Sequence, residues 1–190
     1  MRKHRSVKAL RSVIYAIGAL AGAVSASAEP RETLPDAEIA HAQPGDNEAR
    51  RILAAHNAER LRLGLQPLAW NAALAGDARA HARALAVEGR FEHARDLGRK
   101  GHGENLWMGT SRAWDATEMV QMFLDERRHF RAAPFPDIST TGRWKDVGHY
   151  TQIVWRETRE VGCAIETGEG NDVLVCRYFP AGNVVGRHPY

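Results

Sequence analysis

The spacing of apolar residues predicts two helices in the first half of the chain. The first covers residues 46–63, where Asp46 or Asn47 can cap the helix and Gly64 ends it, and one face includes Ile52, Leu53, His56, Arg60 and Leu63. The second covers residues 71–88, with Asn71 as its N-cap and Gly89 just beyond its end. The apolar face of this second helix is formed by Leu74, Ala75, Ala78, Ala82 and Leu85.

A third helix is expected from Asp115 onward. Asp115 and Glu118 have the spacing of a capping box, in which each side chain satisfies a backbone N–H near the start of the helix. Apolar residues then continue at helical spacing as far as Phe130. The helix is therefore expected to run from Asp115 to Phe130, with Glu126 on its apolar face.

Strand patterns are confined to the last third of the chain. Residues 148–155 are rich in β-branched and aromatic side chains and predict a strand with His149 at its beginning. Residues 161–165 and 173–178 predict a hairpin, and turn-forming residues at 167–171 join its two strands.

Two other segments show no apolar period. Residues 90–112 and 132–145 are expected to be loops, and loops often carry functional residues. The order of elements is then two helices, a loop, a third helix and a group of antiparallel strands. This order predicts an α+β sandwich.

The first 28 residues have the pattern of a secretory signal peptide. Basic residues precede an apolar stretch over residues 13–24, which is short for a membrane-spanning helix, and a small-residue cleavage motif ends at Ala28. The alternative is an uncleaved N-terminal anchor. Residues 29–45 contain three prolines and are expected to form a linker or mobile arm, which leaves one domain over residues 46–190.

Cleavage would also change the charge of the protein. The five basic residues of the signal peptide leave with no acidic ones, so 26 Lys and Arg become 21 against 23 Asp and Glu, and the formal net charge moves from +3 to −2. The excess of basic residues therefore gives no reason to expect nucleic-acid binding. We expect a periplasmic or extracellular protein with no transmembrane segment after cleavage.

The chain has two cysteines, Cys163 and Cys176, one on each strand of the predicted hairpin. In an oxidising compartment an even number of cysteines favours a disulfide. This pair would staple the hairpin and close a short loop, a stabilisation of about 3 kcal/mol. The alternative, a thiolate nucleophile, would require a free cysteine.

Candidate chemistry lies where polar residues interrupt these patterns. Glu126 lies on the apolar face of the third helix, so its carboxylate must be paired, hydrogen-bonded or bound to a metal, unless it reaches water at the edge of that face. His149 opens the predicted strand, and His93 and Glu104 lie in the first predicted loop. These four residues, far apart in sequence, could meet, although a lone loop histidine is more often a surface or core residue.

Several motifs occur in order along residues 48–190. The two longest are Gly-His-Tyr-Thr-Gln-Ile-Val-Trp at residues 148–155 and Leu-Val-Cys-Arg-Tyr-Phe-Pro-Ala-Gly-Asn-Val at residues 174–184. The shorter ones are His56-Asn57-x-x-Arg60, Pro67-Leu68-x-Trp70 and Gly103-Glu104-Asn105-Leu106. Together they resemble the motifs of the CAP superfamily, which contains cysteine-rich secretory proteins, insect venom allergens and plant pathogenesis-related proteins. The last nine residues are similar to the end of plant members.

The resemblance implies a three-layer α-β-α sandwich with a central antiparallel sheet and a cleft that holds two histidines and two acidic residues. Carried over by motif, these are His93, Glu104, Glu126 and His149. Two neutral imidazoles can ligate a divalent metal such as Zn²⁺, with Glu104 and Glu126 ligating directly or through water. Fewer than four protein ligands would leave coordination positions open.

The chain departs from the family pattern at three points. Ala94 follows the first histidine where relatives often carry serine, which weakens any proposal of proteolysis through a hydroxyl at that position. Phe123 stands where relatives commonly carry tryptophan, and the single possible disulfide is fewer than many relatives have.

The sequence is compatible with three functions. The first is a secreted, non-enzymatic binding module for a small apolar ligand, lipid-like or sterol-like, or for a protein partner; the lack of a nucleophile beside a base and of an H-E-x-x-H helix favours it. The second is a metal-dependent hydrolase of peptides or cell-envelope polymers, with Glu104 or Glu126 as general base for a zinc-bound water. In the third, the four residues form a buried polar network that positions loops.

Overall fold

The computed structural model describes residues 44–95 and 101–190, with the backbone alone at residues 44–46. The expected signal peptide, residues 1–28, lies outside the described residues. So does the expected arm over residues 29–45, apart from its last two residues, which begin the first helix. None of the helices in the described ranges is both long and apolar enough to cross a membrane.

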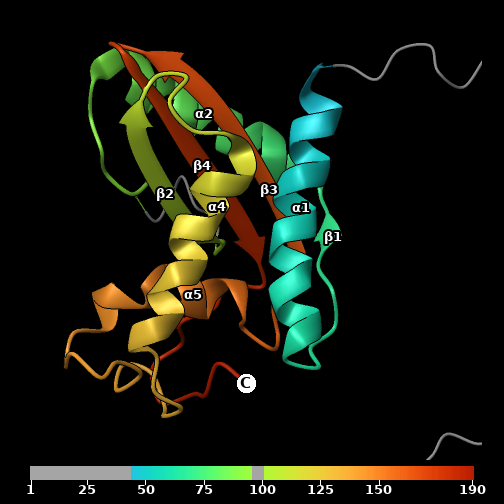
Figure 1. Ribbon diagram of the computed structural model, residues 1–190, viewed down its shortest axis with the longest axis vertical. Coiled ribbons are helices and arrows are strands. Elements are labelled where there is room, and N and C mark those ends of the chain that lie inside the picture. Colours follow the sequence, from blue (N-terminus) through green and yellow to red (C-terminus); the bar gives the residue numbers. More distant parts are fainter. Residues whose placement is uncertain (1–43, 96–100) are drawn as a thin grey trace, which may run out of the picture. The chain divides into compact units, whose positions relative to one another are not determined.

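Four strands form one sheet (Figure 1), in the order β1-β3-β4-β2. Strand β1 pairs parallel with β3, and the other neighbours are antiparallel. The strands are β1 (Ala69–Trp70), β2 (Gly103–Thr110), β3 (Glu160–Gly168) and β4 (Asn171–Phe179). The helices are α1 (Pro44–Arg62), α2 (Ala72–Glu88), α4 (Ala116–Asp125) and α5 (Gly148–Ile153), with short 3₁₀ helices η2 (Glu126–His129) and η3 (Trp144–Asp146).

The sheet lies between two helical layers, with α2 on one face and α1 and α4 on the other (Figure 1). The alternation of side chains along β4 produces this arrangement, because neighbouring residues point to opposite faces. Val173 and Val175 pack with the apolar side of α2, whereas Leu174 and Cys176 pack with α1 and α4. The predicted α+β sandwich is confirmed, and its sheet is antiparallel except for the short β1.

Helix α2 lies close against β3, and glycine makes this contact possible. A Cβ atom added at Gly162 would lie 2.3 Å from the backbone nitrogen of Ala75, and one added at Gly168 would lie 2.5 Å from the carbonyl oxygen of Ala86. Helix α2 also has its predicted ends, since Asn71 accepts hydrogen bonds from two backbone N–H groups and Gly89 closes the helix with φ 60°.

Helix α4 begins as predicted and ends early. Its capping box between Asp115 and Glu118 is present, but the helix stops at Asp125 and continues as the 3₁₀ helix η2. The prediction of one helix as far as Phe130 is therefore wrong. Phe130 has an extended backbone and forms an isolated β-bridge with Ser139, a pairing that a helical conformation at Phe130 would not allow.

Helix α5 replaces the strand predicted over residues 148–155. One carboxylate oxygen of Glu126, Oε2, accepts the backbone N–H groups of His149 at 3.0 Å and Tyr150 at 3.1 Å. These are N–H groups that a helix leaves without internal partners in its first turn. The capping carboxylate comes from another part of the chain, and it outweighs the strand propensity of the β-branched residues.

Strand β2 occupies the second half of the segment predicted as a loop. Leu106 and Met108 pack on the α2 side of the sheet, while Trp107 packs on the other side. Because both faces are covered, apolar and polar residues do not alternate along β2, and its pattern was missed. The predicted hairpin and disulfide are both confirmed: Cys163 and Cys176 lie directly opposite each other on β3 and β4 and are bonded.

Candidate functional site

The first part of the site is an imidazole held by a carboxylate. Glu126 stands at the start of η2, and its Oε1 lies 2.5 Å from Nδ1 of His149. The ring of His149 also stacks on Phe123 of α4, with ring centroids 4.7 Å apart. Since the carboxylate of Glu126 accepts a hydrogen bond from the N–H at Nδ1, the neutral ring presents Nε2 as an acceptor.

The second part of the site is another imidazole held by a carboxylate, formed by His93 and by Glu104 of β2. Nδ1 of His93 lies 2.8 Å from Oε1 of Glu104, and the backbone N–H of Ala94 donates to the same oxygen at 3.0 Å. The side chain of Glu104 is completely buried, whereas that of His93 is 56% exposed. Arg177, opposite Glu104 on β4, places a guanidinium nitrogen 3.0 Å from Oε2.

These contacts keep Glu104 ionised. Burial by itself would raise the pKa of the Glu104 carboxyl, but the hydrogen bond from His93, the charge of Arg177 and the bond from Ala94 together outweigh it and lower the pKa below its usual value. His81 of α2 contributes to the same effect, with its Nε2 3.9 Å from Glu104 Oε2.

The two imidazoles are the candidate metal ligands of this site. Both histidines turn Nδ1 toward a carboxylate, and such carboxylate–histidine pairs orient metal-binding imidazoles in many proteins. The carboxylates therefore act here as partners of the histidines. The four residues do not form a compact ligand set: among the described residues, the one group of three or more candidate ligands within 4.8 Å is His56, Cys163 and Cys176.

That other group is not a metal site in this state of the protein. The two sulfur atoms are bonded to each other, so they offer no thiolate. Both ring nitrogens of His56 are also engaged, Nδ1 with the carbonyl oxygen of Ile52 and Nε2 with the Tyr178 hydroxyl, each at 2.8 Å.

The two histidines open into one cleft of about 580 Å³. His93, His149 and Glu104 line it, while Glu126 stands behind His149. Its apolar walls are formed mainly by Phe91, Leu106, Phe135 and Trp144. Its polar lining also includes Lys145, Gln152 and Asn183. A cleft of this size with a largely apolar wall and a few fixed polar groups is typical of small-ligand sites.

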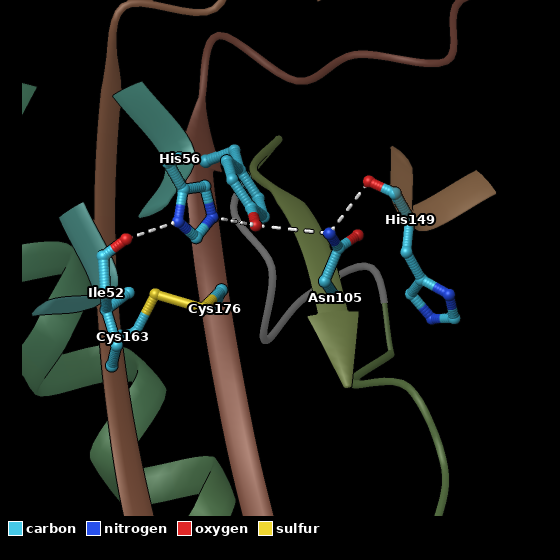
Figure 2. Close-up of a disulfide and its surroundings, with 7 residues drawn as sticks. Ile52, His56, Asn105, His149, Cys163 and Cys176 are labelled. Carbon is cyan, nitrogen blue, oxygen red and sulfur yellow. Dashed lines mark hydrogen bonds between the residues drawn. A yellow bond between two sulfur atoms is a disulfide. The ribbon is translucent and has the colours of Figure 1, made fainter. Parts of the chain in front are cut away.

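A buried chain of hydrogen bonds joins the cleft to the core beside the disulfide (Figure 2). The Tyr178 hydroxyl donates to His56, and the Asn105 side-chain amide donates to the Tyr178 oxygen and to the backbone carbonyl of His149, both at 3.1 Å. His56, Asn105 and Tyr178 are each at most 1% exposed. The chain links α1, β4 and β2 to the first turn of α5, which carries His149.

Sequence reasoning did not assign a role to Asn105, Tyr178 or Arg177. One signal was available: a charged residue within the apolar run of β4 must have a buried partner, and Arg177 has Glu104. The roles of Asn105 and Tyr178 depend on contacts between residues 44 to 122 positions apart, which no local pattern contains.

Comparison with known proteins identifies the family to which this fold and sequence are similar. Residues 53–178 match the family model CAP, the Cysteine-rich secretory protein family. Pathogenesis-related protein 1B of Nicotiana tabacum is 34% identical over 153 residues, which cover 80% of this chain and 86% of the relative. The PR-1 type pathogenesis-related protein of Sambucus nigra is 33% identical over 76% of this chain and 83% of its own length.

The solved structures agree. The crystal structure of NaASP2 with Zn²⁺ superposes with a TM-score of 0.63 at 26% identity, over 76% of this chain and 85% of that one. The structure of BmVAL-1 superposes with a TM-score of 0.63 at 23% identity, over 78% and 82% of the two chains, and supports the fold alone. By its matched domain, its relatives and its fold, this chain belongs to the CAP family of cysteine-rich secretory proteins.

Proposed function

We propose that this protein is an exported binding module whose cleft between His93 and His149 takes a small apolar ligand, lipid-like or sterol-like. The observation that carries the proposal is the cleft itself, about 580 Å³ in volume, with aromatic walls from Phe91, Phe135 and Trp144. Such walls gain free energy by removing apolar ligand surface from water. The imidazoles, Lys145 and Asn183 offer polar groups to the head of the ligand.

A divalent metal such as Zn²⁺ fits the same proposal. His93 and His149 would hold it through Nε2, because Nδ1 of each ring faces a carboxylate. When bound, the metal supplies a Lewis-acidic centre that an anionic or hydroxyl head group can approach. Glu104 and Glu126 would fix the orientation of the rings and make each imidazole a better ligand. The structure of NaASP2 with Zn²⁺ is consistent with metal binding in the family.

The hydrolase alternative has less support from the geometry. A general base must reach a water in the cleft, but Glu104 is completely buried and already faces His93, Ala94 and Arg177. Glu126 uses one oxygen for the ring of His149 and the other for backbone N–H groups. Both carboxylates are therefore committed to positioning.

The decisive experiment is binding by the full-length chain. A fatty acid and a sterol are titrated and the change in tryptophan fluorescence is recorded, with Phe135→Ala as the test variant and Trp114→Ala, outside the cleft, as the control. Saturable binding that Phe135→Ala weakens and Trp114→Ala leaves intact supports the proposal. Saturable binding of neither probe would refute it and would leave a protein partner as the remaining occupant.

The metal is tested separately by calorimetric titration of Zn²⁺. His93→Gln and His149→Gln should each abolish tight binding, and His188→Gln, an exposed histidine elsewhere, should not. Binding should also weaken as the pH falls, because protons and the metal compete for the same imidazole nitrogens. Zinc binding that is unchanged in both cleft variants would rule out this ligand set.

A further inference from the structure

A second pocket lies at the opposite end of β4 from the His93–His149 cleft. Its volume is about 450 Å³, within the range of known ligand sites. It lies between the N-terminal turns of α1, the start of α4 and the β3–β4 turn, and its apolar floor includes Met119 and Ile165. Strand β4 has nine residues, so the two sites are separated by about 25 Å.

One wall of this pocket is a loop held in an unusual conformation. Arg112 has φ 62°, a region that L-residues with side chains rarely adopt. The conformation is maintained by the buried Asp172, whose Oδ2 accepts the backbone N–H of Arg112 at 2.7 Å and whose Oδ1 accepts the hydroxyl of Thr167 at 2.5 Å. Unfavourable backbone conformations that neighbouring contacts enforce often mark functional sites.

The side chains at the mouth offer an aromatic surface and two sets of donors. Trp114 is 43% exposed, which is unusual for so large an apolar ring. Arg51 and Arg112 both line the pocket. The charge of Arg51 acts on the Asp115 carboxylate. Arg112 is held through its backbone N–H, which donates to Asp172. A guanidinium presents five N–H donors in a rigid plane.

The charged residues that line this pocket indicate which class of ligand it can bind. Two guanidinium groups face three carboxylates, Glu48, Asp115 and Asp172. This lining carries no net positive charge, so it does not favour a multiply charged anion such as phosphate. A neutral ring rich in hydroxyl groups fits better, since each hydroxyl both donates and accepts a hydrogen bond.

We propose that the pocket around Trp114, Arg51 and Arg112 binds a neutral saccharide. The apolar C–H face of a sugar ring packs on the indole of Trp114, and its hydroxyl groups bond to the two guanidinium groups and to Glu48. The site is independent of the histidines and does not involve the proposed metal.

The test is ligand-observed NMR on the full-length chain with neutral disaccharides of glucose and of N-acetylglucosamine, with glucuronate and with inorganic phosphate. Trp114→Ala removes the aromatic surface. Arg112→Gly removes a guanidinium and keeps a residue that adopts φ 62° without strain, so it should fold normally. Trp144→Ala is the matched control, since Trp144 is 41% exposed but lines the other cleft.

We expect saturable binding of a neutral disaccharide, at least about tenfold weaker in Trp114→Ala, severalfold weaker in Arg112→Gly and unchanged in Trp144→Ala. Equal affinity in wild type and in both test variants would overturn the proposal, as would the absence of saturable binding to every sugar. Phosphate that displaces the sugar or binds more tightly would also overturn it, because the pocket would then be an anion site. If Trp114→Ala does not fold, Arg112→Gly decides the question.

Discussion

His56 makes the stability of the protein depend on pH. Its ring is completely buried, and burial lowers its pKa from 6.5 to about 4. The nearby charge of Arg60 acts in the same direction, while the hydrogen bond to the Ile52 carbonyl acts against it. The folded protein therefore keeps this imidazole neutral at a pH where the unfolded chain already binds a proton.

Proton linkage gives the direction and the size of the change in unfolding free energy with pH. Above pH 6.5 both states leave His56 neutral, and its contribution to stability is complete. As the pH falls from 6.5 to 4 the unfolded state alone gains a proton, so stability is lost, and below pH 4 the loss stops. Each pKa unit corresponds to 1.36 kcal/mol, so a shift from 6.5 to about 4 amounts to roughly 3 kcal/mol.

Urea unfolding at pH 7 and at pH 4 measures this effect in the wild type and in His56→Gln. The glutamine variant has a lower stability at pH 7 because the ring and its two bonds are lost, but it cannot titrate. We therefore expect the wild type to lose about 3 kcal/mol more than the variant between the two pH values. Equal losses would refute the assignment of a neutral buried imidazole, whatever the absolute stabilities.

The remaining predictions are tested by unfolding at pH 7. Glu104→Gln should lower the free energy of unfolding by about 3 kcal/mol or more, because it removes the charge that buried Arg177 faces. This loss should exceed that of Glu126→Gln, since the side chain of Glu126 is 19% exposed. Equal losses in the two variants would contradict this account. Replacing both cysteines by serine should lower the free energy of unfolding by about 3 kcal/mol. An unchanged free energy of unfolding would show that the disulfide does not stabilise the hairpin. Gly162→Ala should cost at least about 2 kcal/mol, because its Cβ meets the backbone of α2. Gly76→Ala, which meets nothing within 4 Å, is the control and should gain up to about 1 kcal/mol.

The elements that sequence patterns identified are those with local causes. The N-cap at Asn71, the left-handed residue at Gly89 and the capping box at Asp115 each depend on residues within one turn of the chain. The hairpin depends on its own turn and on two apolar runs a few residues apart. In these cases the sequence contains the whole physical reason for the structure.

The elements that were missed have causes elsewhere in the chain. Helix α5 is a helix because Glu126, more than twenty residues earlier, accepts its first N–H groups. Strand β2 is a strand because β4 pairs with it along its full length, and both of its faces are covered. Neither condition leaves a local period, so propensity alone favoured the wrong assignment.

The candidate site was predicted by two different routes. The position of Glu126 on an apolar face indicated that its carboxylate needs a partner, and the structure supplies His149. The inclusion of His93 in the site rested mostly on the family resemblance, and its pairing with Glu104 is seen only in the structure. The positioning residues Asn105 and Tyr178 could be found only once the fold brought them together.

The two halves of the site differ in how far function can be separated from folding. Glu126 uses Oε1 for the ring of His149 and Oε2 for the backbone of α5, and an amide in its place has only one acceptor oxygen for both. A change at Glu126 therefore alters the helix and the imidazole together. His93, in contrast, is more than half exposed and reaches the site from a loop. Its replacement removes one imidazole while the carboxylate of Glu104 keeps Arg177 and Ala94 as partners, so ligand binding at the cleft is best separated from stability by variants of His93.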